Sequence, residues 1–194
     1  EKIVQAAIKL FQERGFEKTT SNDIAAEAGV SVGSFYVYFT DKRHLLLVIF
    51  DRLSEELFKN IFDQLRPEHL FGTELRPMIR EAVARSIQDR QENCGLIKVI
   101  SELVLKDSQF GERQKALIQR SVSKLRELIS LAHKAGRTWD IDVDAAAFLV
   151  HRVVFDISQD YIFGAIDFDQ ERAIDALTDM IDRYLYRPIV PASN

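Results

Sequence analysis

The apolar residues of this chain recur at intervals of three and four positions, and glycine repeatedly interrupts the pattern. The stripe nearest the start of the chain ends at Gly15 and consists of Ile3, Ala6, Ala7, Leu10 and Phe11. Such spacing puts apolar side chains on one face of an α-helix. A half-buried strand needs strict alternation of apolar and polar residues, and no stretch of the chain sustains it. The sequence therefore predicts an all-α fold.

Glycine and proline divide the chain into about nine predicted helices. The first three are expected over residues 1–15, 21–28 and 32–38, and a long fourth helix over residues 41–65. Five more follow Pro67, over residues 74–91, 95–106, 109–135, 143–164 and 170–186. The last two are apolar on more than one face, so each is expected to pack both within its own domain and against a second copy of the chain.

The composition describes a globular chain without a membrane segment or a metal site. Of the 194 residues, 46% are hydrophobic and 29% are charged, which is enough apolar material to bury a core. The longest apolar run, around residues 45–50, is far shorter than the roughly 18 residues that span a bilayer. Residues 1–15 do not resemble a signal peptide. The single cysteine, Cys94, fits a cytoplasmic location, and the four scattered histidines give no reason to expect a metal or cofactor.

Residues 20–38 have the pattern of a helix-turn-helix. Thr20 and Asp23 are spaced as a capping box at the start of one short helix. A turn around Gly29 leads to a second short helix, which Ser31 can cap. An ordinary pair of antiparallel helices has the same local pattern, so the surface residues of the second helix must decide whether the pair binds DNA.

That second helix carries no charged residue, although a solvated helix normally carries Lys and Glu. Its projecting residues suit a surface pressed into the major groove of DNA, and they are Val32, Gly33, Ser34, Val37 and Tyr38. Lys42 falls in the first turn of the next helix, where the helix dipole favours an acidic residue, and a bound phosphate would explain it. The net charge of −4 arises beyond residue 50, because the first 50 residues hold six basic and six acidic side chains.

The segment from Ile3 to about Ile49 resembles the DNA-binding domain of TetR-family transcriptional regulators. Four motifs occur in order at the family's spacing: LF-x-x-x-GF-x-x-TT, DIA-x-x-AGVS, GSFY-x-YF and DK-x-x-LL. The rest of the chain resembles the family's second domain in length and helical pattern. The resemblance implies a helix-turn-helix DNA-binding domain over residues 1–45 and a helical ligand-binding and dimerisation domain over residues 46–194.

The resemblance also implies a sequence-specific repressor that binds a near-palindromic double-stranded operator as a homodimer and is released by a small-molecule inducer. Carried over by position, its DNA-contacting residues are Ser21, Asn22, Val32, Gly33, Ser34, Tyr36, Val37, Tyr38 and Lys42. For Tyr36, half burial against the rest of the chain is the alternative. Asp23 is better explained as the acid of the capping box.

An inducer site between the fourth to eighth helices needs apolar walls and a few polar groups. For the wall residues, ordinary packing in the helical core is the alternative. The residues expected from their spacing are Phe58, Phe62, Met78, Ala82, Ile97, Ile100, Leu117 and Ser121. His151, which shares a helix face with Phe155, is the polar candidate, with a hydrogen-bonded structural histidine as the alternative. Because few charged groups stand among these positions, we expect a largely apolar, aromatic or amphipathic effector and not a phosphorylated metabolite.

A homodimer is expected through the last two predicted helices, because twofold contacts would bury their second apolar faces. Arg152, Asp156 and Asp160 interrupt that surface, either as a salt-bridged lock or as a solvent-exposed rim. The sequence has no Gly-rich phosphate loop, GxSxG motif or paired Cys or His motif, so no enzyme is expected. Two alternatives stay open: a TetR-like DNA-binding protein without an inducer, serving an architectural or cell-division role, and a transcriptional activator.

Overall fold

The computed structural model describes residues 1–63, 65, 75–165 and 167–187. In these residues there are nine α-helices: α1 (Lys2–Arg14), α2 (Ser21–Glu27), α3 (Val32–Tyr38), α4 (Lys42–Phe62), α5 (Leu75–Glu92), α6 (Cys94–Val104), α7 (Ser108–Lys134), α8 (Val143–Phe163) and α9 (Gln170–Leu185). The same residues contain no strand, and an isolated β-bridge joins Thr138 to Tyr186. The predicted all-α fold of about nine helices is confirmed.

The helix boundaries lie within three residues of those predicted, and the largest difference is at the end of α4. That helix ends at Phe62, whereas the apolar pattern continues to residue 65. The N–H of Leu65 donates to the carbonyl oxygen of Phe62 at 3.2 Å, a tighter turn than the α-helix makes. Pro67, the expected end signal, lies outside the described residues.

The chain forms two compact units. Unit 1 comprises residues 1–56 and 93–116, and unit 2 comprises residues 57–92 and 117–194. The boundaries between them fall inside α4 and inside α7, so each of these helices contributes residues to both units. These units reflect compactness alone and do not test the functional boundary expected after residue 45. The functional division into residues 1–45 and 46–194 stays a prediction.

Unit 1 is built around buried aromatic side chains. Phe35 of α3 and Phe110 of α7 are fully buried, and the Phe110 ring lies 6.1 Å from the ring of Phe50 on α4. Helix α6 comes close to α1 at Gly95, where a Cβ would stand 3.0 Å from Cγ of Gln12. A larger residue at this position would have to displace the Gln12 side chain.

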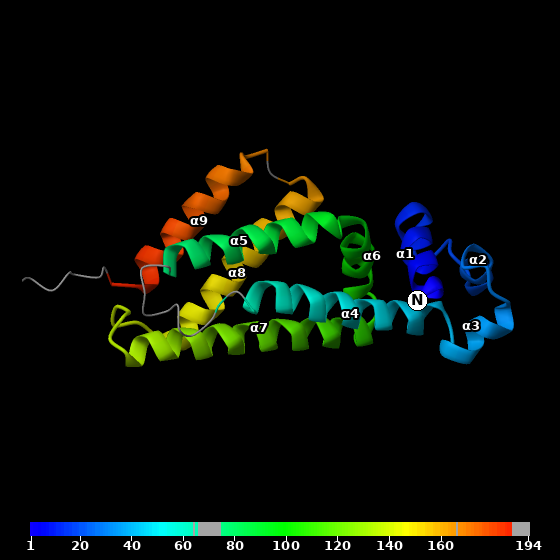
Figure 1. The fold of residues 1–194 in the computed structure, drawn as a ribbon, viewed down its shortest axis with the longest axis horizontal. Helices are drawn as coiled ribbons and strands as arrows, with labels where there is room; N and C mark the ends of the chain where they lie inside the picture. The colour runs from blue at the N-terminus through cyan, green and yellow to red at the C-terminus, as the bar shows by residue number, and fades with distance from the viewer. Residues whose placement is uncertain (64, 66–74, 166, 188–194) are drawn as a thin grey trace, which may run out of the picture. The chain divides into compact units, whose positions relative to one another are not determined.

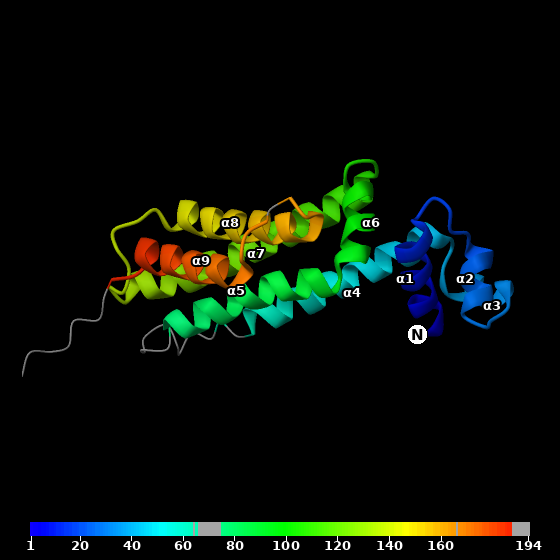
Figure 2. The same ribbon diagram turned by 90° about the horizontal axis from the view of Figure 1, so that it is seen from above.

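In unit 2, α5 packs against both α8 and α9, and the three helices can be followed in both views (Figures 1 and 2). The core among them is mainly aliphatic and includes the fully buried residues Ile87, Ala146 and Ala147. Tyr186, just beyond α9, is also part of this core, and burial raises the pKa of its hydroxyl to about 12.

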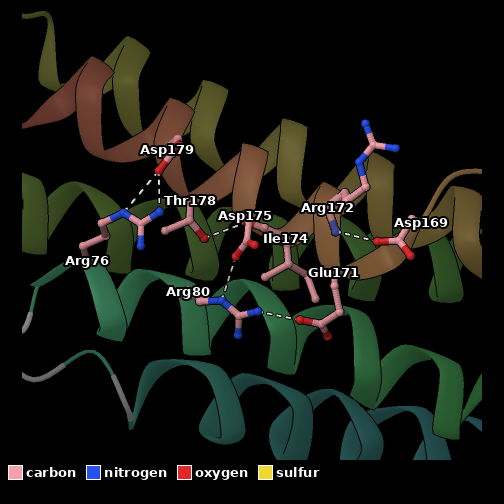
Figure 3. Close-up of polar contacts among 9 residues, drawn as sticks. All are labelled: Arg76, Arg80, Asp169, Glu171, Arg172, Ile174, Asp175, Thr178 and Asp179. Carbon is pink, nitrogen blue, oxygen red and sulfur yellow. Dashed lines mark hydrogen bonds and ion pairs between the residues drawn. The ribbon is translucent and has the colours of Figure 1, made fainter.

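Ion pairs connect α5 to α9 at the edge of this core (Figure 3). Arg76 donates to Asp179 at 2.5 Å, and Arg80 donates to Asp175 at 2.9 Å and to Glu171 at 2.5 Å. The partner numbers fall on α9 as they rise on α5, so the two helices run antiparallel. Because these side chains are partly exposed, the pairs contribute more to register than to stability.

Side-chain caps hold the N-termini of the two seven-residue helices α2 and α3. Thr20 Oγ1 accepts from the backbone N–H of Asp23 at 3.1 Å, and Asp23 Oδ2 accepts from the backbone N–H of Thr20 at 2.9 Å. The predicted capping box is therefore present, and its hydrogen bonds lower the pKa of the Asp23 carboxyl. Ser31 Oγ caps α3 by accepting from the N–H of Ser34 at 3.0 Å.

We predict that Thr20→Ala lowers the free energy of unfolding by about 1 kcal/mol, because the N–H of Asp23 loses its cap. Chemical denaturation followed by circular dichroism measures the change. The matched control is Ser123→Ala, at an exposed position inside α7, where the change should stay within about 0.5 kcal/mol. Equal stability of Thr20→Ala and the wild type would show that the capping box does not stabilise α2.

Candidate nucleic-acid interface and ligand cavity

Helix α3 is buried on one side and open to solvent on the other. Phe35 has no exposed surface, whereas Val37 and Tyr38 are 76% and 69% exposed. Val32 is also exposed. Tyr36 is 53% exposed, and its ring makes a T-shaped contact with the ring of Phe35, so it is partly packed against the rest of the chain while its contact with DNA stays a prediction. The open side of α3 is thus an uncharged surface of apolar and aromatic groups.

The other predicted DNA-contacting residues of unit 1 differ in their exposure to solvent and in their hydrogen bonds within the chain. Gly33 is exposed, and a Cβ there would meet only Ser31 Oγ, at 3.8 Å. The free protein therefore does not require glycine at this position. Ser34 Oγ lies 2.8 Å from Ser31 Oγ, so its hydroxyl takes part in the cap. At the start of α2, Asn22 is exposed and Ser21 is partly exposed.

Lys42, in the first turn of α4, already has hydrogen-bond partners within unit 1. Its Nζ donates to the carbonyl oxygens of Phe16 at 2.8 Å and Glu17 at 3.3 Å, and it lies 4.4 Å from the centre of the Phe16 ring. The lysine thus connects the α1–α2 loop to α4. An ammonium group has three donors, so one remains for the DNA phosphate, and that contact stays a prediction.

Arg43 joins the start of α4 to the turn between α6 and α7. Its Nε and Nη2 donate to the two carboxylate oxygens of Asp107 at 2.5 and 2.7 Å, and its Nη1 donates to Gln109 at 3.2 Å. The hydrogen bonds from Arg43 lower the pKa of the Asp107 carboxyl to about 2. A bidentate pair fixes orientation as well as distance, so it aligns the start of α4 within unit 1.

Unit 2 contains a partly open cavity of about 130 Å³, roughly ten times the space that one water molecule needs. Six of the ten residues predicted for the effector site line it, namely Phe62, Met78, Ala82, Ser121, His151 and Phe155. The other four, Phe58, Ile97, Ile100 and Leu117, are not among its lining residues. Ile97 and Ile100 are buried in unit 1, because α6 packs there against α1.

Arg90 is a cavity residue that the sequence analysis missed. Ala82, Ser86 and Arg90 follow one another at intervals of four on α5 and all line the cavity. The interval is visible in the sequence, but arginine on a helix normally indicates a solvated position. Here the guanidinium carbon lies 4.4 Å from the centre of the Phe155 ring, and burial lowers the pKa of Arg90 to about 10. The side chain is therefore still charged at neutral pH.

His151 lines the same cavity, and its Nδ1 atom is buried without a hydrogen-bond partner. Its ring stacks on Phe155, with 5.7 Å between the ring centres. Burial, with a smaller effect from the charges of Arg90 and Arg152, lowers the pKa of His151 to about 4, so the imidazole is neutral at pH 7. The alternative of a hydrogen-bonded structural histidine is not supported at this atom.

Large apolar side chains are exposed along α8 and α9, and they include Phe148, Leu149, Phe163, Met180 and Tyr184. Exposed apolar groups gathered on neighbouring helices are typical of an interaction surface. Arg152 and Asp156, which interrupt the apolar pattern of α8, form an ion pair with each other at 2.9 Å. This ion pair is compatible both with a salt-bridged lock and with a solvent-exposed rim.

Among the described residues, no three His, Cys, Asp or Glu side chains are grouped so that they could hold a metal ion. Within the same ranges, no helix is both long enough and apolar enough to cross a membrane. Cys94, at the start of α6, is a partly exposed free thiol.

Residues 3–49 match the family described as bacterial regulatory proteins, tetR family. The matched segment holds nearly all of α1, the whole of α2 and α3, and the start of α4. The match therefore includes α3, whose exposed side is described above, and the two helices before it.

The chain as a whole is similar to known regulators. It is 27% identical over 192 residues to the HTH-type transcriptional regulator YvdT of Bacillus subtilis, covering 97% of this chain and 94% of YvdT. It is 24% identical over 202 residues to the HTH-type transcriptional regulator AcrR of Shigella flexneri, covering 99% of this chain and 93% of AcrR.

Its fold is similar to that of NalD, the secondary repressor of the MexAB-OprM multidrug efflux pump in Pseudomonas aeruginosa. The TM-score is 0.68 at 23% identity, over 96% of this chain and 95% of NalD. Residues 3–49 therefore match the tetR family, and the chain as a whole is similar in sequence to HTH-type transcriptional regulators and in its all-α fold to solved TetR-family structures.

Proposed function

We propose that the chain is a ligand-responsive repressor that binds a near-palindromic operator in the cytoplasm as a homodimer and is released by a small-molecule inducer. The observation that carries the proposal is the exposed, uncharged side of α3. The apolar cavity of unit 2 supports a ligand, and the exposed apolar side chains of α8 and α9 support a dimer. The name of NalD supports repression.

Helix α3 has the groups needed to read bases in the major groove. Val32 and Val37 can contact thymine methyl groups, and Ser34 can hydrogen-bond to a base edge. The hydroxyls of Tyr36 and Tyr38 can donate to phosphate oxygens, which position the helix without reading sequence. In a dimer, the two copies of α3 would reach half-sites separated by one or more helical turns of about 34 Å each.

Helix α4 is the element through which a ligand would act on DNA binding. Its first residues, Lys42 and Arg43, belong to unit 1, and its last residue, Phe62, lines the cavity of unit 2. A ligand that shifts Phe62 would move the start of α4, and with it the α1–α2 loop that Lys42 holds. Release follows only if the ligand binds more tightly to the DNA-free state than to the DNA-bound state.

The two alternatives differ from this proposal in measurable ways. A TetR-like protein without an inducer would keep its operator affinity throughout a metabolite screen, whereas a repressor with an inducer would lose it for one class of compound. An activator would raise transcription from a promoter that carries its operator. The cavity and its polar residues favour a protein that responds to a ligand.

Gly33→Ala tests whether α3 is the DNA-reading helix. The added methyl has room in the free protein, and alanine favours a helix over glycine, so stability should rise by up to about 1 kcal/mol. Against a base edge, the same methyl should change which base is preferred. The difference in binding free energy between bases should shift by about 1–3 kcal/mol at a contacted base pair. Selection of binding sites from random DNA, followed by anisotropy titrations, measures the change. Identical selected sites and affinities would exclude α3 from the interface.

Tyr38→Ala and Lys42→Ala should weaken binding to all DNA sequences alike, because phosphate contacts carry no base information. For Lys42→Ala, the slope of log affinity against log salt should become shallower by about one. This variant also loses hydrogen bonds to Phe16 and Glu17, so its stability must be measured in parallel. Tyr38 is exposed, so Tyr38→Ala should fold normally, and unchanged operator affinity in that variant would contradict the assignment.

Met180→Glu should convert the dimer to a monomer, because the interface would have to bury an unpaired carboxylate from each chain. Sedimentation velocity at micromolar concentration measures the change. The matched control is Leu105→Glu, at a residue of unit 1 that is 90% exposed and lies outside α8 and α9, and this variant should stay dimeric. A monomeric wild type, or a dimeric Met180→Glu variant, would rule out this interface.

A further inference from the structure

We propose that the cavity of unit 2 binds a linear amphipathic carboxylic acid, whose carboxylate lies between Arg90 and His151 and whose hydrocarbon tail extends toward Leu75 and Leu185. This inference rests on the proposed function, since it names the chemical class of effector for the same cavity. Two independent features carry it, an arginine on the cavity wall that has no ion-pair partner among the described residues and a buried imidazole nitrogen without any partner.

Arg90 is a partly buried cation on the cavity wall. Among the described residues, its hydrogen bond is the one from Nη1 to Oε1 of Gln159, and at 3.4 Å it is long. Within the described ranges, no carboxylate forms an ion pair with the Arg90 guanidinium. Partial removal of an unpaired charge from water is unfavourable, so an anionic ligand that pairs with Arg90 would stabilise it.

The acidic residue next to Arg90 is already engaged elsewhere. The Asp89 carboxylate accepts from Nε of Arg85 at 2.8 Å and from Nδ2 of Asn60 at 3.0 Å. The negative charge of Asp89 raises the pKa of Arg90, but this effect is smaller than the lowering of the pKa by burial. No Asp or Glu occurs among the described residues that line the cavity. The wall therefore carries one positive charge and no negative charge.

The contact with Phe155 holds Arg90 in place without using up its donors. This cation–π contact, 4.4 Å from the guanidinium carbon to the ring centre, requires no N–H bond. Arginine has five N–H donors, of which Gln159 receives one. The remaining donors allow a carboxylate to accept two parallel hydrogen bonds, the arrangement in which arginine binds carboxylates best.

His151 is the second sign of a polar ligand at this end of the cavity. Buried polar atoms nearly always have a hydrogen-bond partner, and an unpaired one on a cavity wall fits a missing ligand. A neutral imidazole can donate one hydrogen bond from Nδ1 to a carboxylate oxygen. Phe155 contacts both the His151 ring and the Arg90 guanidinium, so the two polar groups lie at the same end of the cavity.

Apart from Ser86, Ser121 and Tyr186, the rest of the wall is apolar, and it is long enough for a hydrocarbon tail. The lining residues of α5 start at Leu75 and end at Arg90, and the helix rises about 22 Å between these two residues. Antiparallel to α5, α9 adds Ile181 and Leu185 near the Leu75 end. An anion with a tail fits this distribution, whereas a cationic amphiphile would be repelled by Arg90 and a neutral alcohol would leave its charge unpaired.

Three probes with the same ten-carbon tail test the proposal, namely decanoate, decan-1-ol and decyltrimethylammonium. In calorimetric titrations of the full-length wild-type protein at neutral pH, decanoate should bind roughly tenfold or more tightly than decanol. Decyltrimethylammonium should show no measurable binding. This comparison needs no variant, so it decides the matter even if substitutions at Arg90 impair folding.

Arg90→Met should lower the affinity for decanoate by roughly tenfold to a hundredfold and leave the affinity for decanol unchanged, because the apolar stem is kept. Arg90→Lys keeps the charge and should retain part of the preference for decanoate. The matched control is Arg172→Met, which removes a positive charge over the Phe168 ring, outside the cavity. The affinity of this control for decanoate should equal that of the wild type.

Equal affinity for all three probes, or tighter binding of the ammonium compound, would overturn the proposal. So would equal losses of decanoate affinity in Arg90→Met and Arg172→Met. Operator titrations separate this inference from the proposed function. Binding of decanoate through Arg90 without DNA release would overturn the effector role of the cavity, whereas release by another class of ligand, without decanoate binding, would overturn this inference alone.

Discussion

Two turns of helix are too few to be stable alone in water, and α2 and α3 have seven residues each. Both depend on an N-terminal cap and on a buried anchor, which for α3 are Ser31 and Phe35. This constraint fixes which side of α3 packs into unit 1. The opposite side, with Val37 and Tyr38, is then free to contact DNA. The proposed reading surface is a consequence of how a very short helix is anchored.

Contacts that position the helices of unit 1 also involve residues outside the matched segment 3–49. Arg43 pairs with Asp107 in a bidentate contact, so the turn between α6 and α7 helps to position α4 inside unit 1. Helix α4 in turn ends at Phe62 on the cavity wall of unit 2. The proposed ligand at Arg90 would therefore share the cavity with Phe62 of α4, the helix that follows the proposed DNA-reading helix α3. Regulation in this account needs one continuous helix and a small number of ion pairs.

Local rules predicted the fold well, because caps and apolar spacing act over a few residues. Thr20 and Ser31 mark the helix starts in the sequence as clearly as in the structure. The cavity was harder to predict, since the spacing of Ile97 does not tell which unit α6 packs into. Arg90 does not stand out in the sequence, because only its partial burial on the cavity wall distinguishes it from a solvated arginine. The unusual placement of Lys42 is visible in the sequence. Its carbonyl partner Phe16 is not predictable, because the two residues lie far apart in the sequence.

The central claim is that occupation of the cavity in unit 2 weakens DNA binding through α3. Ala82 is 8% exposed and lines that cavity, so Ala82→Trp should fill it. Ala116→Trp, at an exposed position of α7, is the control. The decisive measurement is the operator affinity of the three proteins with and without decanoate. The account predicts that decanoate releases the wild type and the control and leaves Ala82→Trp unaffected. Release of Ala82→Trp with wild-type potency would contradict it.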